Sequence, residues 1–334
     1  MVDMHHTVSD GISSQVVVRE AAALYRGERL PGLRLQYRDF SLWQTRQKES
    51  GILKRQEAYW LEVFAGKLPV LELPTDFRRP AVQSFAGRSV PFEIDPRQAS
   101  ALKEIAAAQQ ATLFMVILAI FAVFISKITG QEDIVIGTVT AGRGHEDLRD
   151  LVGMFVNTLA LRNTVAGELT FNRFLASVRE RALNAFDNQD YPFEDLVDRV
   201  ELYRVADRNP VFSVTFDEIA GEENGPGQRT APQNPAPAAS PLSVKSYGFD
   251  REISQFDLML RRVVLKERLL FKMVYCSKLF KRETIDRFIK YFNEILAAVV
   301  ENSEVKLGDI SISPGLLTVE SNTLDAYQKE FVFE

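Results

Sequence analysis

The sequence predicts an α/β fold, an α+β two-layer sandwich of helices on a sheet, and three observations lead to this prediction. Segments with apolar residues at helical spacing alternate with short β-branched runs along the chain. Residues 113–125 are all apolar, which predicts a helix buried on every side, since a membrane span needs about 20 such residues. With 334 residues, 46% of them hydrophobic, the chain can bury one large core or two modest ones.

The individual elements follow from periodicity and from the residues that start or stop each segment. Helices are expected over residues 12–25, 44–64, 96–109, 112–129, 171–187, 195–200 and 282–300. Strands are expected over residues 88–94, 133–140, 155–162, 211–216, 256–260 and 269–275. The β-branched run at 134–136 is typical of a strand covered on both faces. Both tryptophans, Trp43 and Trp60, are expected to anchor the packing of helix on helix.

Proline and glycine divide the chain into regions. Residues 74–91 are predicted to be an extended connector, because proline restricts both itself and its predecessor. This places a boundary between a first region, residues 1–73, and a second lobe, residues 92–313. Residues 221–246 hold five of the chain's 14 prolines and predict a loop without a packed core. Residues 314–334 are predicted to be a solvated tail or linker.

Charge and cysteine content restrict partners and location. The net charge of −5 and a pI near 5.5 argue against nucleic acid or an anionic membrane as the main partner. The single cysteine, Cys276, excludes an internal disulfide and suits a reducing compartment; a small buried residue is expected there. Because the histidine motif begins within five residues of Met1, no signal peptide is expected, and the predicted location is cytoplasmic.

Neither a metal site nor a resident cofactor is expected. Only three histidines are present, and two of them, His5 and His6, are adjacent, so they would diverge on a strand. The loop at 140–145 lacks the third glycine of a dinucleotide-binding loop and the lysine of a P-loop. Phosphate binding at this loop is therefore not predicted.

The residues best suited to proton transfer and charge stabilisation are concentrated in positions 4–11. If residues 2–4 close a strand, His5 and His6 point to opposite faces, and the exposed imidazole could accept a proton near neutral pH. Asp10 would neutralise a cation or accept backbone N–H bonds, and Gly11 would let the chain turn where a Cβ would clash. The alternative interpretation is an ordinary strand end followed by a turn and a helix.

Five motifs follow one another along the chain, beginning with this one. They are His5-His6-x-x-x-Asp10-Gly11, Tyr37-x-Asp39-Phe40-x-x-Trp43, Ile136-Gly137-Thr138 through Ala141-Gly142-Arg143 to Gly153-x-Phe155-Val156-Asn157-Thr158, Asn188-Gln189-Asp190-Tyr191-Pro192-Phe193-Glu194, and Arg208-Asn209-Pro210-Val211-Phe212. Together they resemble the condensation domain of nonribosomal peptide synthetases. The first motif alone is shared with other acyltransferases of the chloramphenicol acetyltransferase-like superfamily.

The resemblance implies an architecture and a set of partners. In this family two lobes form a V with the active site in a tunnel between them, and the histidine motif ends the N-terminal lobe. The chain would then hold the C-terminal lobe and a remnant of the N-terminal lobe, residues 1–73, so it is expected to be a fragment that lacks the rest. The implied partners are that missing lobe, upstream and downstream peptidyl carrier domains, and an adenylation domain downstream. Substrates would be tethered to the carriers by phosphopantetheine, with no cofactor of the chain's own.

The family's reaction suggests a role for each candidate residue. The α-amine of a carrier-bound aminoacyl thioester attacks an upstream acyl or peptidyl thioester, so no enzyme nucleophile is needed. His6 would act as general base or as a positioner of the amine, whereas His5 would be structural and turned into the sheet. Asp10 would form an ion pair that fixes the loop, with Arg143 or an arginine of the missing lobe as the cation. The Gly11 N–H could face the oxyanion.

The sequence leaves open the roles of two asparagines and the choice between the amide-forming function and two alternatives. Asn157 and Asn209 either line the tunnel or cap turns at strand ends. The chain could instead belong to an ester-forming or epimerising relative with the same histidine motif. It could also be an inactive scaffold. Heterocyclisation is disfavoured, because that subtype carries aspartates in place of the paired histidines.

Overall fold

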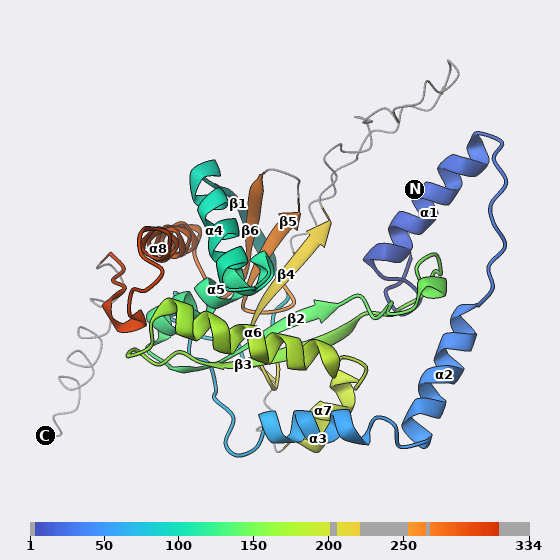
Figure 1. Ribbon diagram of the computed structural model, residues 1–334, viewed down its shortest axis with the longest axis horizontal. Coiled ribbons are helices and arrows are strands. Elements are labelled where there is room, and N and C mark those ends of the chain that lie inside the picture. Colours follow the sequence, from blue (N-terminus) through green and yellow to red (C-terminus); the bar gives the residue numbers. More distant parts are fainter. Residues whose placement is uncertain (1–3, 201–205, 221–252, 265–267, 314–334) are drawn as a thin grey trace, which may run out of the picture.

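The computed structural model describes residues 4–200, 206–220, 253–264 and 268–313 (Figure 1). The loop predicted at 221–246 and the tail predicted at 314–334 lie outside the described residues. So do residues 1–3, where the strand before the histidines was expected to end.

The described strands form one mixed sheet in the order β1-β6-β5-β4-β2-β3. The pairs β1–β6, β5–β6 and β2–β3 are antiparallel, whereas β4 runs parallel to both β5 and β2. Strands β4 and β2 share a single registered pair, Thr215 with Gly137, whereas the neighbouring β4–β5 and β2–β3 pairs are in register over seven and eight residues. The strands are β1 (Gly87–Ile94), β2 (Asp133–Thr140), β3 (Asn157–Thr164), β4 (Val214–Ala220), β5 (Leu258–Val264) and β6 (Leu269–Cys276).

One face of this sheet carries the main helical layer (Figure 1). Helices α4, α5, α6 and α8 lie there, and α5 contacts α4, α6 and α8 as well as β2 and β4. The predicted two-layer α/β arrangement is therefore present. The described helices are α1 (Gly11–Tyr25), α2 (Tyr37–Glu49), α3 (Lys54–Val63), α4 (Pro96–Ala108), α5 (Leu113–Thr129), α6 (Phe171–Asp187), α7 (Phe193–Arg199) and α8 (Arg282–Glu301).

Helix α5 is the centre of the core, as its sequence predicts. Every residue from Met115 to Ile125 is buried. The Met115 N–H donates to Thr112 Oγ1 at 3.3 Å and starts the helix, and Gly130 ends it in the left-handed region at φ 70°. The strand at 134–136 is also covered, and Cys276 is a buried free thiol, as expected.

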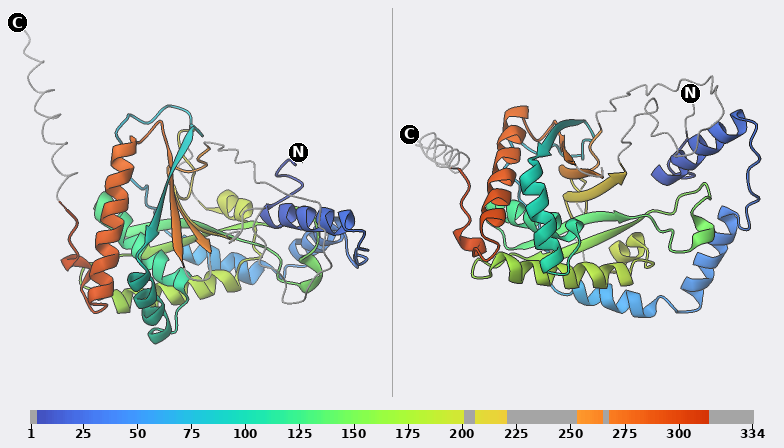
Figure 2. Two further views of the ribbon diagram at one scale, coloured as in Figure 1. Left: turned by 90° about the horizontal axis from the view of Figure 1, so that it is seen from above. Right: turned by 45° about the horizontal axis from the view of Figure 1, so that its top comes forward.

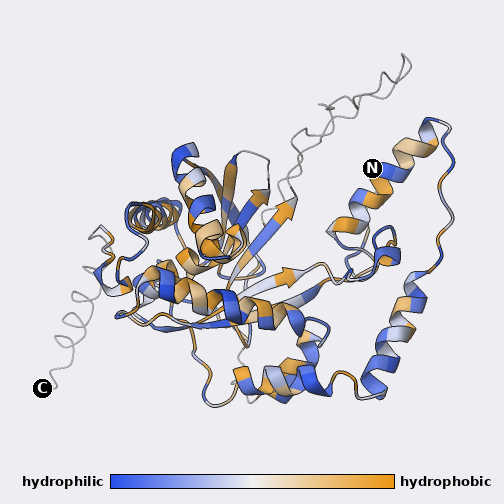
Figure 3. Cartoon of the chain, viewed as in Figure 1, coloured by the Kyte–Doolittle hydropathy of each residue, from blue (hydrophilic) through white to orange (hydrophobic). Residues whose placement is uncertain are grey.

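Residues 4–50 extend away from this core as an N-terminal arm (Figure 2). The arm carries α1 and α2 and meets the loop between β2 and β3. Helix α2 buries none of its residues, and α1 buries only Ser13, Val16 and Ala23. Hydrophobic and hydrophilic residues mix along both helices (Figure 3), and Val18 of α1 is 63% exposed.

Three predictions about the elements and their packing are wrong. The helix expected over 44–64 is broken after Glu49, because Gly51 adopts φ 74°, and a separate helix begins at Lys54. Trp60 is 2% exposed and anchors the core, but Trp43 is 46% exposed, because it lies on α2, which buries none of its residues; its ring packs beside that of Phe40, with centroids 5.8 Å apart. Strands β3, β4 and β5 also begin two or three residues later than predicted.

No single described helix has the length and apolar character to cross a membrane; α4 and α5, bent by 106° where they meet, pass only as a pair and only by length and composition. In the described part of the chain, His, Cys, Asp and Glu side chains nowhere gather in a group of three that could hold a metal ion.

Candidate active site

The histidine loop, residues 4–10, is a turn that leads directly into α1. The Val8 N–H and the Ser9 hydroxyl both donate to the His5 carbonyl, at 3.0 Å and 3.1 Å. Both imidazoles, His5 and His6, lie on the surface. The prediction that His5 turns into the sheet is therefore wrong: its Nδ1 accepts the Thr7 N–H at 3.2 Å and stabilises the turn locally.

Asp10 is buried, and both of its carboxylate oxygens are bonded. It caps α1, because Oδ1 accepts the Ser13 N–H at 2.7 Å. Oδ2 accepts the Phe155 N–H at 3.3 Å. Burial alone would raise the pKa of Asp10, but hydrogen bonds from Ser13 and Arg143 and the charge of Arg143 outweigh it and lower that pKa. The group is therefore held as a carboxylate.

Arg143 supplies the positive charge. Its Nη2 lies 2.9 Å from Asp10 Oδ1 and 3.1 Å from Oδ2, and the two side chains are 3% and 0% exposed. Its Nη1 donates to the carbonyls of Leu148 and Leu151 at 2.6 and 2.8 Å, and the guanidinium lies 4.1 Å from the centre of the Phe155 ring. The ion pair between Asp10 and Arg143 that the sequence suggested is present, and the cation comes from this chain.

Ser13 is a participant that the sequence reasoning missed. It is fully buried and contacts Asp10, Arg143 and Gly153. Its position three residues after Asp10 is the spacing at which a cap and the first helical turn exchange hydrogen bonds, which is the signal that could have found it.

Gly11 is the first residue of α1. A Cβ built on it would meet nothing within 4 Å, so the described structure shows no clash that requires glycine there, contrary to expectation. Its N–H belongs to the first turn of the helix, where backbone donors have no intrahelical acceptor. The partial positive charge of this helix end lies directly beside the histidine loop.

The two asparagines lie apart from this network. Asn157, at the start of β3, clamps the turn before α7: its Nδ2 donates to the carbonyls of Gln189 and Tyr191 at 2.7 and 2.8 Å, and its Oδ1 accepts the Phe193 N–H at 3.2 Å. Asn209 donates to the Gln255 carbonyl at 3.2 Å and lines a pocket of about 340 Å³ beside residues 69–72. In the described structure both side chains brace loops.

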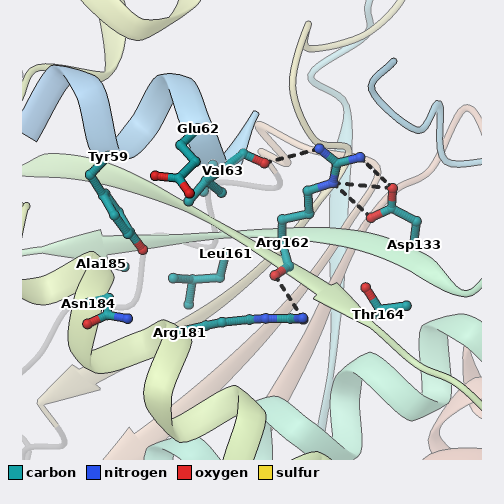
Figure 4. A pocket seen from close by; sticks show the side chains of 11 residues that line it. Tyr59, Glu62, Val63, Asp133, Leu161, Arg162, Thr164, Arg181, Asn184 and Ala185 are labelled. Carbon is teal, nitrogen blue, oxygen red and sulfur yellow. Dashed lines mark hydrogen bonds and ion pairs between the residues drawn. The ribbon is translucent and has the colours of Figure 1, made fainter. Parts of the chain in front are cut away.

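A larger pocket of about 570 Å³ lies between α3, β3 and α6 (Figure 4). Arg162 spans one side, bound to Asp133 and to the Val63 carbonyl, while Arg181 donates to the Arg162 carbonyl at 3.4 Å. Burial raises the pKa of Tyr59 to about 12. None of the predicted site residues lines this pocket. It is therefore separate from the histidine loop.

Residues 1–316 of the chain match the family model of the Condensation domain. The chain belongs to the condensation domain family. It is 42% identical over 313 residues to gramicidin S synthase 2 of Aneurinibacillus migulanus, an alignment that covers 93% of this chain and 7% of that protein. It is also 42% identical over 311 residues to tyrocidine synthase 3 of Brevibacillus parabrevis, covering 93% of this chain and 5% of that one. The chain thus spans a small part of the curated synthetases that it matches.

Solved structures agree on the fold. The X-domain from teicoplanin biosynthesis superposes with a TM-score of 0.79 at 23% identity, covering 93% of this chain and 71% of that one. The first condensation domain of the calcium-dependent antibiotic synthetase, in complex with a substrate analogue, has a TM-score of 0.69 at 18% identity, covering 93% of this chain and 66% of that one. The predicted condensation-domain family and its chloramphenicol acetyltransferase-like fold are confirmed.

Proposed function

We propose that this chain is part of a condensation domain that forms an amide bond between two carrier-bound substrates of a nonribosomal peptide synthetase. The observation that carries the proposal is an exposed imidazole, His6, on a loop whose end is fixed by the buried ion pair of Asp10 and Arg143, in a chain of the condensation domain family. An accessible proton acceptor on a fixed support is what amine attack requires.

The reaction needs a proton acceptor but no enzyme nucleophile. The acceptor's α-amine nitrogen attacks the carbonyl carbon of the donor thioester, the new C–N bond forms, and the C–S bond then breaks. An α-amine has a pKa of about 7.7–8.0, so His6 need only hold or take one proton from the nitrogen and pass it to the leaving thiolate. The products are an amide on the downstream carrier and a free thiol on the upstream carrier.

Asp10 acts in this proposal as an anchor. Its two oxygens are bonded to Ser13, Arg143 and Phe155, and within the described residues neither oxygen bonds to a histidine. It therefore orients the loop that carries His6 without relaying the proton. The exposed Gly11, at the start of α1, offers its N–H and the partial positive charge of the helix end to the oxyanion of the tetrahedral intermediate.

The partners follow from the proposed reaction. Upstream and downstream peptidyl carrier domains would present both substrates on phosphopantetheine arms, and an adenylation domain would load the downstream carrier. The N-terminal lobe, whether part of the same polypeptide or added separately, would close the other side of the tunnel. The single buried cysteine and the need for carrier-bound thioesters support a cytoplasmic location.

The deciding experiment combines the chain, an N-terminal lobe supplied in trans or by fusion, and two loaded carriers. Mass spectrometry of the downstream carrier reports the condensed product. His6→Ala should abolish the product, whereas the matched control His145→Ala, which removes a histidine with a 71% exposed side chain, should retain it. Undiminished product from His6→Ala would refute the assignment.

The same assay separates the remaining functions. Amine and hydroxyl acceptors are offered in parallel on the downstream carrier. Ester formation in preference to amide formation would favour an ester-forming relative, and inversion of the donor without condensation would favour an epimerising one. No turnover with any lobe or acceptor would favour a scaffold.

A further inference from the structure

The first part of the arm, the described residues 4–26 with the histidines and α1, is joined by hydrogen bonds to one other segment of the molecule, whereas α2 also reaches α7 through Lys48 and Asp195. Within the described residues, each long-range hydrogen bond of residues 4–26 ends on the loop between β2 and β3, residues 141–156, here called the β2–β3 loop. We infer that Ser13 is a positioning residue through which the β2–β3 loop holds the histidine loop, and so fixes where the His6 imidazole stands. This inference deepens the proposed function and rests on it.

Ser13 uses every bonding position of its hydroxyl group. Its Oγ accepts the Gly153 N–H at 3.0 Å and an N–H of Arg143 Nη2 at 3.1 Å. Its single proton faces two acceptors, Asp10 Oδ1 and the Gly153 carbonyl, each at 2.8 Å. A hydroxyl offers one donor and two acceptor positions, so this side chain is saturated and shared between the two loops.

The peptide held by Ser13 is confined from its other side by the second arm helix. A Cβ on Gly153 would lie 2.1 Å from Cδ2 of Tyr37, so only glycine fits. The Tyr37 hydroxyl donates to the Met154 carbonyl at 2.8 Å. Helix α1 therefore forms hydrogen bonds to residue 153 through Ser13, while α2 packs against the same residue through Tyr37. Both arm helices contact the β2–β3 loop at this point.

Apolar packing does not replace this polar anchor for α1. The small cluster of Leu148, Leu151 and Phe155 packs with Leu35, Tyr37 and Phe40, which belong to α2 and the segment before it. Helix α1 buries two apolar side chains, Val16 and Ala23, but neither belongs to this cluster or to the main core. The buried contacts that join the start of α1 to the β2–β3 loop therefore come from Asp10 and Ser13, and they set the angle at which α1 leaves the histidine loop. A displacement of about 1 Å at a reacting group can cost about 100-fold in rate.

Ser13 also influences the pKa of Asp10. A change in that pKa is a measurement that distinguishes a positioning role from a merely structural one. The backbone and side-chain hydrogen bonds from Ser13 help lower the pKa of Asp10. Removing the hydroxyl should raise that pKa. The ion pair with Arg143 would then be lost at a higher pH than in the unaltered chain, and the histidine loop would be released with it.

The activity test compares Ser13→Ala with Ser14→Ala. Ser14 is the neighbouring serine, is exposed, and reaches only the Asp10 carbonyl at 3.4 Å. Ser13→Ala should lower kcat by about 100-fold with KM for the carrier-bound substrates nearly unchanged, and should move the acidic limb of the kcat profile to higher pH. Ser14→Ala should behave as the unaltered chain does. Equal kcat values and pH profiles for the two variants would overturn the inference.

Two measurements on the full 334-residue chain decide the inference without any turnover. Hydrogen exchange should accelerate in α1 of Ser13→Ala while α5 stays protected, and carbon NMR should report a higher pKa for the Asp10 carboxyl. Gly153→Ala, which pushes Tyr37 aside, should accelerate exchange in α1 in the same way. Unchanged exchange and an unchanged Asp10 pKa would refute the positioning role. If the unaltered chain makes no amide, the proposed function fails, but these measurements still test Ser13.

Discussion

The N-terminal arm and the sheet core are stabilised by different forces. In the core, α5 buries each residue from Met115 to Ile125, and apolar side chains surround it. In the arm, α2 buries nothing, and α1 is held by the polar contacts of Asp10 and Ser13. Apolar packing sums many weak contacts, whereas the arm depends on a few directional bonds. The candidate catalytic histidine therefore lies in the region where the loss of one hydrogen-bonding side chain removes a large share of the contacts.

The two tryptophans give the sharpest test of this contrast and the largest expected effect. Trp60 is 2% exposed, packs against the rings of Tyr59 and Phe64, and donates its indole N–H to the Asn188 carbonyl at 2.9 Å. Trp60→Ala should lower the free energy of unfolding by about 3–5 kcal/mol, because it leaves a large cavity. Trp43→Ala, on the arm, should change it by no more than about 0.5 kcal/mol.

Denaturant titration followed by circular dichroism measures both variants. If Trp43→Ala proved as destabilising as Trp60→Ala, the arm would be part of the cooperative core and the contrast would fail. A matched aromatic control is Phe85→Ala, since Phe85 is 55% exposed, and its effect should resemble that of Trp43→Ala.

The same contrast explains how much of the fold the sequence predicts. Within the core, periodicity and local caps agree with tertiary packing, so α5, α6 and β2 were predicted to within a residue. In the arm, periodicity suggested one long helix, but the positive φ of Gly51 ends α2 and redirects the chain. Trp43 was misjudged because composition indicates that a tryptophan prefers burial, and cannot indicate whether a partner surface lies opposite.

The candidate site shows a similar limit. The family resemblance suggested Arg143, or an arginine of the missing lobe, as the partner of Asp10, and the structure contains the pair with Arg143. The spacing of Ser13 from Asp10 marks it as a residue of the first helical turn, but its bonds to residue 153, 140 positions away in sequence, could not be predicted. Contacts of that separation are determined by the packing of the whole chain. No local pattern records them.

Arg143→Met should produce a large effect confined to the arm. Removing the cation leaves the Asp10 carboxylate buried without its partner, which typically costs about 3–5 kcal/mol. Because the arm shares little apolar surface with the core, we expect the loss to appear as local opening of α1 with α5 unaffected. Hydrogen exchange followed by mass spectrometry resolves the two helices.

A matched control for that change lies in the same loop. Arg149 is exposed, and Arg149→Met should leave exchange in both helices unchanged. Uniformly faster exchange in α1 and α5 of Arg143→Met would mean that the arm and the core open together, against the contrast drawn here.

Two buried carboxyl groups extend the comparison to pH, with the smallest expected effect. In the arm, the pKa of Asp10 lies below its ordinary value of 3.8, so the stability it contributes is present above pH 3.8 and is lost as the pH falls through the folded value. In the core, burial raises the pKa of Asp217 from 3.8 to about 6, opposed by Arg261, by Thr215 and by the Val139 N–H. The two groups therefore respond to pH in opposite senses.

The sign for Asp217 follows from which state releases its proton first. Between pH 3.8 and about 6 the carboxyl of the unfolded chain is ionised while the folded one remains protonated, so core stability falls as the pH rises. A shift of about 2 pKa units corresponds to roughly 3 kcal/mol. Asp217→Asn removes this titration, so the variant should lose less stability than the unaltered chain across the window. Asp187→Asn, at an exposed aspartate, should leave the pH dependence unchanged. Parallel curves for the unaltered chain and Asp217→Asn would show that the core tolerates the ionised carboxylate without cost.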